Sequence, residues 1–255
     1  MPSTYVITGC SSGIGLDLVK ELAGRGDKVY ATVRTRKNSM TGDDLLSAVK
    51  GDVTIIEGVD VSDDGVGDVL KKALAGVTID VLIHNAGSVN GTRAVKGEGI
   101  FGEQKYPQVN IETMKRSFDV NCIGPLRVQQ ALTDQIKSPG GKVVLLSTGM
   151  ASIDDNGSGG IYAYRCSKAA MNMLAKSLAM DLKAKEICCC PVAPGHVVSE
   201  FGPGQEAMKK MGAAPVNQAT KGILGVLEEK MNTMEGTGVF WMVSTKTGEL
   251  NVMPW

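Results

Sequence analysis

An excess of charge of either sign is missing from this sequence, because 27 lysines and arginines balance 27 aspartates and glutamates among 255 residues. The chain creates no overall field that favours nucleic acid or an anionic membrane surface, so any phosphate recognition must be local. It also lacks an apolar run near the roughly 20 residues that span a bilayer, and no basic region precedes the first apolar segment. We therefore expect a cytoplasmic protein with no nucleic-acid or membrane partner.

Metal-binding patterns are scarce as well. The six cysteines contain no CxxC spacing, and the two histidines are His84 and His196. Cys188, Cys189 and Cys190 are consecutive, and a strand points neighbouring side chains to opposite faces, which argues against bridges among them. We expect reduced thiols that pack as small apolar residues, and no metal site. We interpret His84 as a hydrogen-bonded structural residue, and leave His196 open between pocket lining and surface.

Short β-rich runs alternate with segments of helical periodicity. Ile14, Leu18 and Leu22, for example, recur at helical spacing before Gly24 and Gly26 end their segment. The alternation predicts a single domain over residues 1–255, an α/β fold with a doubly wound parallel sheet of about seven strands and helices on both faces. The expected strands are Tyr5–Thr8, Lys28–Val33, Val53–Ile56, Val81–His84, Lys142–Leu146, Ile187–Val192 and Val239–Val243. Ligands should gather at the carboxyl ends of these strands.

Glycine is concentrated directly after the first expected strand, where the chain reads Thr8-Gly9-Cys10-Ser11-Ser12-Gly13-Ile14-Gly15. A glycine turn lets the backbone approach a ligand, and the following helix presents unpaired N–H groups and its positive dipole end to phosphate. The segment therefore predicts a nucleotide-binding turn. The alternative is a tight turn whose small residues serve packing, since the spacing departs from GxGxxG. Because a helix amino terminus can lower a thiol's pKa, we also hypothesise a reactive Cys10.

A tyrosine and a lysine stand one helical turn apart in Tyr164-Arg165-Cys166-Ser167-Lys168. At i and i+4 on a helix the two side chains share a face. An ammonium about 4 Å away supplies about 4 kcal/mol at an effective dielectric near 20, enough to lower a phenol's pKa by about three units. The spacing predicts a proton donor at Tyr164. The alternative is a packed tyrosine beside an ordinary solvated lysine.

These motifs together resemble the short-chain dehydrogenase/reductase family, in its single-domain branch and most closely the sniffer and C-factor type of carbonyl reductases. The glycine turn is similar to the family's TGxxxGxG, and Tyr164 to Lys168 to its YxxSK. The resemblance implies a Rossmann fold and NAD(P)-dependent hydride transfer to a carbonyl or from an alcohol. It places the cofactor on Gly9, Ser11, Ser12, Gly13, Ile14, Gly15, Asp60, Val61, Asn85, Ala86, Gly87, Tyr164, Lys168, Pro194, Gly195, Val197 and Ser199.

Cofactor choice is read at the end of the second expected strand, where an acidic residue would bond the ribose of NAD and repel a 2′-phosphate. This chain has Val33 and Arg34 there. Arg34 can meet a phosphate with its planar fork, so we predict NADPH in preference to NADH. The alternative interpretation is a solvated basic loop.

The resemblance also implies roles beyond the tyrosine and lysine. Aligning the fifth strand puts Thr148 where the family has its substrate-orienting serine, with Ser147 as the fallback, and Asn121 where it has a helix asparagine that supports the proton relay. A threonine hydroxyl can donate the same hydrogen bond. Family members commonly pair through the two helices that carry this asparagine and the tyrosine, so the resemblance implies a homodimer or homotetramer.

Two stretches lack periodicity, Ser88–Val109 and Gly195–Val216, and we interpret them as an insertion beside the active-site mouth and a mobile flap. The first stretch and the threonine at position 148 motivate a rival hypothesis, an NADP-binding sensor or interaction protein with little or no turnover. Retention of both Tyr164 and Lys168 favours the enzyme.

Overall fold

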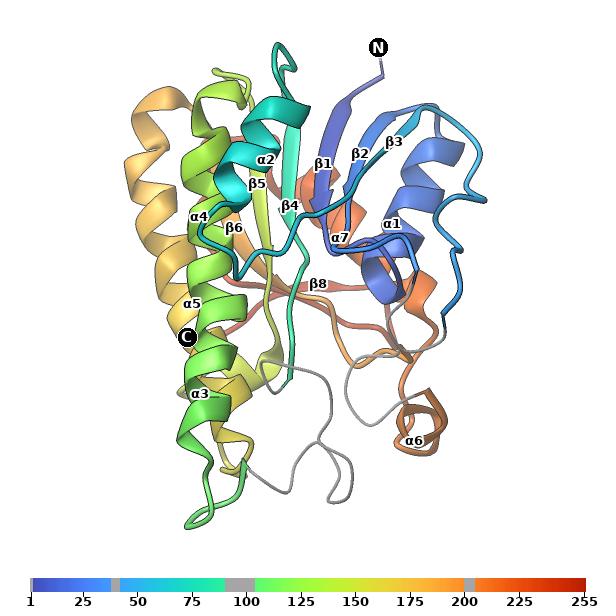
Figure 1. The fold of residues 1–255 in the computed structure, drawn as a ribbon. Helices are drawn as coiled ribbons and strands as arrows, with labels where there is room; N and C mark the ends of the chain where they lie inside the picture. The colour runs from blue at the N-terminus through green and yellow to red at the C-terminus, as the bar shows by residue number, and fades with distance from the viewer. Residues whose placement is uncertain (1, 38–41, 90–103, 200–204) are drawn as a thin grey trace.

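Helices cover both sides of a central sheet in Figure 1, a computed structural model that describes residues 2–37, 42–89, 104–199 and 205–255. The eight strands lie in the order β3-β2-β1-β4-β5-β6-β7-β8. Pairing is parallel from β3 to β7, and β8 runs antiparallel to β7. The strands span Thr4–Thr8 (β1), Lys28–Thr32 (β2), Val53–Ile56 (β3), Val81–His84 (β4), Lys142–Leu146 (β5), Cys188–Ala193 (β6), Trp241–Val243 (β7) and Leu250–Val252 (β8).

The predicted doubly wound α/β fold is confirmed, and its strand order reverses between β1 and β4. At such a switch point the carboxyl ends of neighbouring strands leave room for a ligand. The helices are α1 (Gly13–Gly24), α2 (Val66–Ala73), α3 (Ile111–Phe118), α4 (Gly124–Leu132), α5 (Tyr162–Asp181), α6 (Gln205–Lys210) and α7 (Val216–Gly225). Among the described residues, none of the helices combines the length and the apolar character that crossing a bilayer requires.

Side chains alternate between the two faces of the sheet and pack into two separate hydrophobic cores. Val6 packs in the cluster that contains residues of α2, α4 and α5, whereas Ile7 packs in the cluster that contains residues of α1 and α7. Cys188 and Cys190 lie in the second cluster and Cys189 in the first. The three thiols are free and buried, as apolar packing residues should be, and burial raises the pKa of each.

The sequence predicted about seven strands and the sheet has eight, because β8 was not predicted. Leu250–Val252 is three residues long at the edge of the sheet, with Leu250 half-buried and Asn251 and Val252 exposed. A run this short carries too few side chains to show alternation.

The candidate Asn121 lies in a π-helical turn, Asp119–Ile123, that joins α3 to α4. Pro125 follows in the first turn of α4 and cannot donate a backbone hydrogen bond to the π turn before it. A π turn inserts an extra residue into a helix and often marks a functional position. Here it is the element that carries the fully buried Asn121.

The two stretches expected to be irregular are described in part. Residues 90–103 and 200–204 lie outside the described residues. In the second stretch the expected irregularity is wrong for the described part, because Gln205–Lys210 forms α6 and Val197 bridges to Ala214, and the mobile flap stays a prediction. Backbone pairing of Val198 and Ala214 adds a hydrogen bond of 2.8 Å, which ties the segment back to the end of β6.

Candidate functional site

The turn between β1 and α1 has no room for side chains at two glycines. Gly9 has a φ of +74°, and a Cβ there would lie 2.8 Å from the Ala86 Cα. A Cβ on Gly15 would lie 2.5 Å from the Asn85 Nδ2 and equally close to the Gly9 carbonyl oxygen. Asn85 donates through that nitrogen to the carbonyl oxygens of Thr8 and Gly9, at 2.8 and 2.9 Å. The carboxyl ends of β1 and β4 are therefore locked together.

The amino terminus of α1 is suited to an anion. The helix follows Ser12, whose side chain makes no capping hydrogen bond, and its first turn has no acidic residue. Gly13 has a φ of +57° and lies beside Ser199, since a Cβ on Gly13 would be 3.6 Å from the Ser199 Cβ. Ser11 and Ile14 are partly exposed on either side. The first N–H groups of a helix lack internal partners, so this arrangement can receive a phosphate.

Cys10 lies in the same turn, and the hypothesis that its thiol is reactive is wrong. The side chain is fully buried, and Sγ donates to the Ile7 carbonyl oxygen at 3.2 Å. Burial raises the pKa of the Cys10 thiol. The thiol packs in the core and gains nothing from the positive end of α1.

Two exposed arginines follow β2. Arg36 is paired with Glu57 at 2.5 Å, whereas Arg34 forms no ion pair with the described residues. The backbone carbonyl of Arg34 accepts from Gly58 at 3.2 Å, which anchors the loop at the end of β3. Arg34 is thus available to an anionic group beside the carboxyl end of β2.

Asp60 and Val61 follow β3. The Asp60 carboxylate accepts from the N–H and the hydroxyl of Ser62, at 3.0 and 2.7 Å. Val61 is buried against Gly124, where a Cβ would lie 2.9 Å from the Val61 Cγ2. This segment therefore forms a fixed wall between the ends of β3 and the start of α4.

Asn121 and Lys168 meet beside Gly87, just after β4. A Cβ on Gly87 would lie 3.3 Å from the Asn121 Oδ1 and 3.6 Å from the Lys168 Nζ. Lys168 is 4% exposed, and its ammonium donates to the Leu146 carbonyl oxygen at 2.6 Å. Burial lowers the pKa of Lys168 to about 8. The glycine leaves space directly over both side chains.

Asn121 connects this point to the helix that carries Tyr164. Its Oδ1 accepts from the Ser88 N–H at 2.8 Å, and its Nδ2 donates to the Ser88 carbonyl oxygen at 2.7 Å and to the Ser167 hydroxyl at 2.9 Å. The Ser167 hydroxyl donates to the Tyr164 carbonyl oxygen at 3.0 Å. We assigned no role to Ser167 from the sequence, although a serine three residues after a helical position commonly bonds back to it.

Thr148 and Ser147, the two candidates after β5, face different neighbours. The Thr148 hydroxyl is hydrogen-bonded to the Tyr164 phenol and accepts from the Met150 N–H at 3.2 Å. The Ser147 hydroxyl donates instead to the Asn172 Oδ1 at 2.6 Å and is buried. The geometry brings Thr148 to Tyr164 and separates Ser147 from it.

The phenol of Tyr164 has a raised pKa in this structure. Burial raises it to about 12, and the hydrogen bond from Thr148 opposes the rise. We expected Lys168 to lower the pKa of the Tyr164 phenol, and this prediction is wrong for the protein without a bound ligand. The physical reason is that desolvation of the buried phenol disfavours its anion, while the Lys168 ammonium is bonded to the Leu146 carbonyl.

The last group of candidate residues lies directly after β6. Pro194 is buried, and Gly195 has a φ of +82° with a Cβ position only 2.5 Å from the Thr245 Cγ2. Val197 and Ser199 are buried, whereas His196 is exposed, which places it at the surface. The turn thus requires glycine at position 195.

His84 agrees with the structural role expected for it. It is 2% exposed at the end of β4, and its Nε2 is hydrogen-bonded to the Gln129 Oε1 at 3.1 Å. Burial lowers the pKa of His84 to about 4, so the ring is neutral at pH 7.

The sequence pattern described as short chain dehydrogenase matches residues 3–210, which include every candidate site residue. The chain belongs to this family. One relative is the 1-hydroxy-2-glutathionyl-2-methyl-3-butene dehydrogenase of Rhodococcus sp. (strain AD45), 28% identical over 78% of this chain and 80% of the relative. Another is the C-signal of Myxococcus xanthus, 33% identical over 59% of this chain and 81% of that protein.

Carbonyl reductase [NADPH] 2 of Sus scrofa is 28% identical over 92% of this short-chain dehydrogenase and 93% of the relative. Among solved structures, a short-chain dehydrogenase/reductase from Burkholderia multivorans with bound NADP is similar, with a TM-score of 0.79, 25% identity and full coverage of both chains. The carbonyl reductase Sniffer of D. melanogaster has the same fold, with a TM-score of 0.75, 22% identity and full coverage of both chains.

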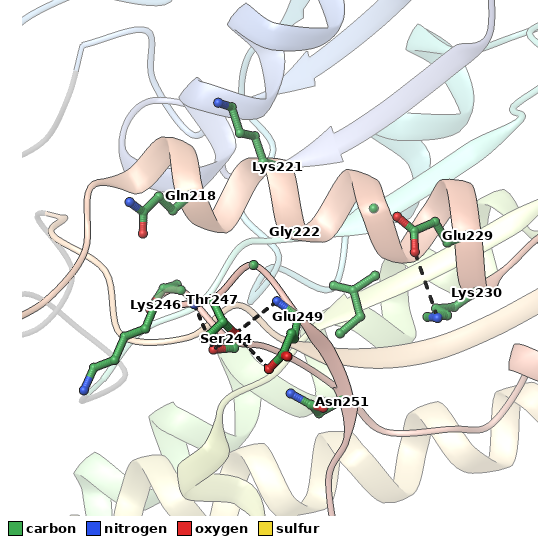
Figure 2. Close-up of a pocket in the computed structure, with 14 residues that line it drawn as sticks. Gln218, Lys221, Gly222, Glu229, Lys230, Ser244, Lys246, Thr247, Glu249 and Asn251 are labelled. Atoms are coloured by element: carbon green, nitrogen blue, oxygen red, sulfur yellow. Dashed lines mark hydrogen bonds and ion pairs between the residues drawn. The ribbon is translucent and has the colours of Figure 1, made fainter.

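A separate hollow of about 590 Å³ lies between α7 and the β7–β8 hairpin of this short-chain dehydrogenase (Figure 2). None of the candidate residues lines it. Glu229 lies 4.0 Å from Lys230, and the Thr247 hydroxyl donates to Glu249 at 2.9 Å, so several of its polar groups satisfy one another. We place the candidate site at the ends of β1, β4 and β5, because the phenol, ammonium and hydroxyl groups gather there. Among the described residues, no three or more His, Cys, Asp or Glu side chains form a potential metal site.

Proposed function

We propose that this chain is an NADP-dependent oxidoreductase of the carbonyl reductase type, which transfers a hydride between nicotinamide and a carbonyl or alcohol substrate. The observation that carries the proposal is the hydrogen bond between Thr148 and Tyr164, on a helix that also presents the buried Lys168. The crowded glycine turn and the uncapped start of α1 fit the cofactor's pyrophosphate. Bound NADPH supplies the hydride.

In the reducing direction, the hydroxyls of Thr148 and Tyr164 hold the substrate's carbonyl oxygen. Tyr164 gives its phenolic proton to that oxygen as negative charge develops on it. The ammonium of Lys168 stabilises the phenolate left behind and binds the cofactor's ribose. Asn121 supports this proton relay by fixing the backbone around Tyr164 through Ser167. The raised pKa keeps the phenol protonated at pH 7, so the proton is present when the substrate binds.

The cofactor preference that we propose is NADPH over NADH. Arg34 is exposed at the end of β2 and unpaired with described residues, so its guanidinium can meet a 2′-phosphate. Asp60 and Val61 would hold the adenine end, and Pro194, Gly195, Val197 and Ser199 would hold the nicotinamide end. The NADP named for the Burkholderia multivorans structure supports this assignment.

We propose that the enzyme works in the cytoplasm as a homodimer or homotetramer. The exposed face of α5 carries four apolar side chains at helical spacing, namely Tyr162, Cys166, Met173 and Met180. A second copy would bury this apolar stripe. Light scattering tests the assignment, since Met173→Glu would place a charge in the stripe and shift the protein toward monomer.

The second candidate is an NADP-binding sensor with little or no turnover. The similarity to a protein named C-signal supports it, as does a phenol whose pKa lies far above neutrality. A sensor needs the nucleotide turn but has no use for a proton at Tyr164.

The deciding experiment titrates NADPH and NADH into purified protein by nicotinamide fluorescence, then adds ketones, aldehydes and quinones while following absorbance. NADPH binding with turnover that is lost in Tyr164→Phe supports the reductase. Tyr106→Phe is the matched control, because that tyrosine is exposed and has no assigned role. Tight binding without turnover of any carbonyl favours the sensor, and binding of neither nucleotide overturns both.

A further inference from the structure

The helix that carries Tyr164 lacks a cap of its own. Its N-cap residue is Ile161, which makes no side-chain capping bond and has a φ of +50°, in the left-handed region that β-branched residues rarely adopt. Tyr164 is the third residue of α5, so its N–H has no acceptor within the helix. A buried N–H without an acceptor is costly, so the acceptor must come from elsewhere in the chain.

That acceptor is Gln104, a residue 60 positions earlier in the chain. The Tyr164 N–H donates to the Gln104 Oε1 at 3.1 Å, and the Gln104 Nε2 donates to the Val89 carbonyl oxygen at 3.2 Å. The side chain of Gln104 is fully buried. Its amide therefore joins the start of α5 to the segment that follows β4.

These bonds close a circuit around the phenol-bearing residue. Val89 follows Ser88, which exchanges two hydrogen bonds with the Asn121 amide. The circuit then returns to α5, so that the Tyr164 backbone is held at its N–H and at its carbonyl. In order, it passes through Tyr164, Gln104, Val89, Ser88, Asn121 and Ser167.

We propose that Gln104 is a positioning residue that sets the placement of the Tyr164 phenol relative to Thr148 by capping α5 from outside the helix. The proposal rests on the proposed function for its effect on turnover. The contact itself is independent of that function. A small misplacement of a reacting group lowers the rate of a reaction without a matching loss of binding.

The test compares Gln104→Met, which keeps the size of the side chain but has no acceptor, with Gln104→Glu, which keeps an acceptor for the N–H. We expect Gln104→Met to lower kcat by about 10- to 100-fold with little change in KM or in NADPH affinity. Hydrogen exchange of the Tyr164 amide should become faster in the same variant. Gln104→Glu should recover part of both losses.

Gln135→Met is the matched control, since the Gln135 amide also donates to backbone carbonyls, of Leu74 and Val77, away from the site. The proposal is overturned if, in Gln104→Met, both the hydrogen-exchange rate of the Tyr164 amide and kcat equal those of the wild type. It is also overturned if Gln135→Met loses as much kcat at an equal loss of stability. A wild type without turnover overturns the proposed function alone, and the amide exchange then still decides whether Gln104 holds Tyr164.

Discussion

Thr148 is hydrogen-bonded through its hydroxyl to the Tyr164 phenol, while the preceding residue, Ser147, donates to Asn172 at 2.6 Å. Neighbouring residues at the end of a strand point in opposite directions, so only one of the two hydroxyls can face the phenol. The consequence is a clean separation of roles. One hydroxyl is available to a substrate oxygen, and the other joins β5 to α5.

Thr148→Val should therefore lower kcat by about 100-fold or more, the usual loss when a donor to a developing oxyanion is removed. Thr148→Ser should retain most activity because it keeps the hydroxyl. Ser147→Ala should instead lower the free energy of unfolding by about 1–3 kcal/mol, as expected for a buried acceptor that loses its donor, with kcat close to wild type. Steady-state kinetics and urea unfolding measure both. The assignment fails if Ser147→Ala folds normally and loses turnover while Thr148→Val keeps it.

Two glycines of α1 give opposite predictions for substitution by alanine. At Gly15 the added Cβ would collide with the Asn85 Nδ2 and the Gly9 carbonyl at 2.5 Å, which forces the nucleotide turn open. NADPH affinity should fall by about tenfold or more, or at least about 1.4 kcal/mol. At Gly24 nothing lies within 4 Å of the new Cβ, so the helix should gain roughly 0.5–1 kcal/mol with unchanged affinity. Calorimetry of NADPH binding compares them, and equal affinity in both variants would contradict the placement of the cofactor.

Much of this fold was predictable because parallel strands leave a clear sequence pattern. The bounds expected for Val53–Ile56, Val81–His84 and Lys142–Leu146 match those observed. The glycine turn was also predictable, since its residues are contiguous and each is needed locally. The edge strand β8 was not predictable, because three residues carry no period.

The candidate site was predictable only where spacing within one helix decides it. Tyr164 and Lys168 lie on one helix, so their common face follows from the sequence. The choice between Thr148 and Ser147 depends on where β5 ends, and the contact of Tyr164 with Gln104 joins residues 60 positions apart. Burial also overrode the expected charge effect, because the desolvation that raises the pKa of Tyr164 depends on packing that spacing does not reveal.

Arg34 and Arg36 should respond differently to replacement by alanine. Arg36 already has a partner in Glu57, whereas Arg34 is unpaired among the described residues. If Arg34 meets a 2′-phosphate, Arg34→Ala should weaken NADPH binding by about 10- to 100-fold and leave NADH binding unchanged. Arg36→Ala serves as the control and should weaken neither by a comparable amount. An equal loss for both nucleotides in Arg34→Ala would show that the guanidinium does not read the 2′ position.

The pH dependence of carbonyl reduction should be set by Lys168. The proposed step needs a protonated Tyr164 and a charged Lys168, whose pKa values are about 12 and about 8. The lower value limits the reaction, so kcat should fall as pH rises through about 8. Lys168→Arg keeps its charge at higher pH, and the falling limb of its residual activity should move upward. A wild-type profile that stays flat far above this value would contradict the role of the ammonium.

His84 should make the protein less stable in mild acid. Its pKa is lowered from 6.5 to about 4 by burial, so the folded state binds fewer protons than the unfolded state between these values. The corresponding stability is fully present above pH 6.5 and is lost as pH falls toward 4. From pH 7 to pH 5 this group alone should cost about 2 kcal/mol of unfolding free energy.

His84→Gln removes the titrating ring and keeps an amide that can bond Gln129, so the variant should lose about 2 kcal/mol less than the wild type over the same pH interval. Urea unfolding of both proteins at the two pH values measures the difference, and the shared carboxylates cancel in the comparison. Equal losses in the two proteins would mean that the ring can be protonated in the folded state. Because the hydrogen bond to Gln129 at 3.1 Å lies in a core closed to water, we expect unequal losses.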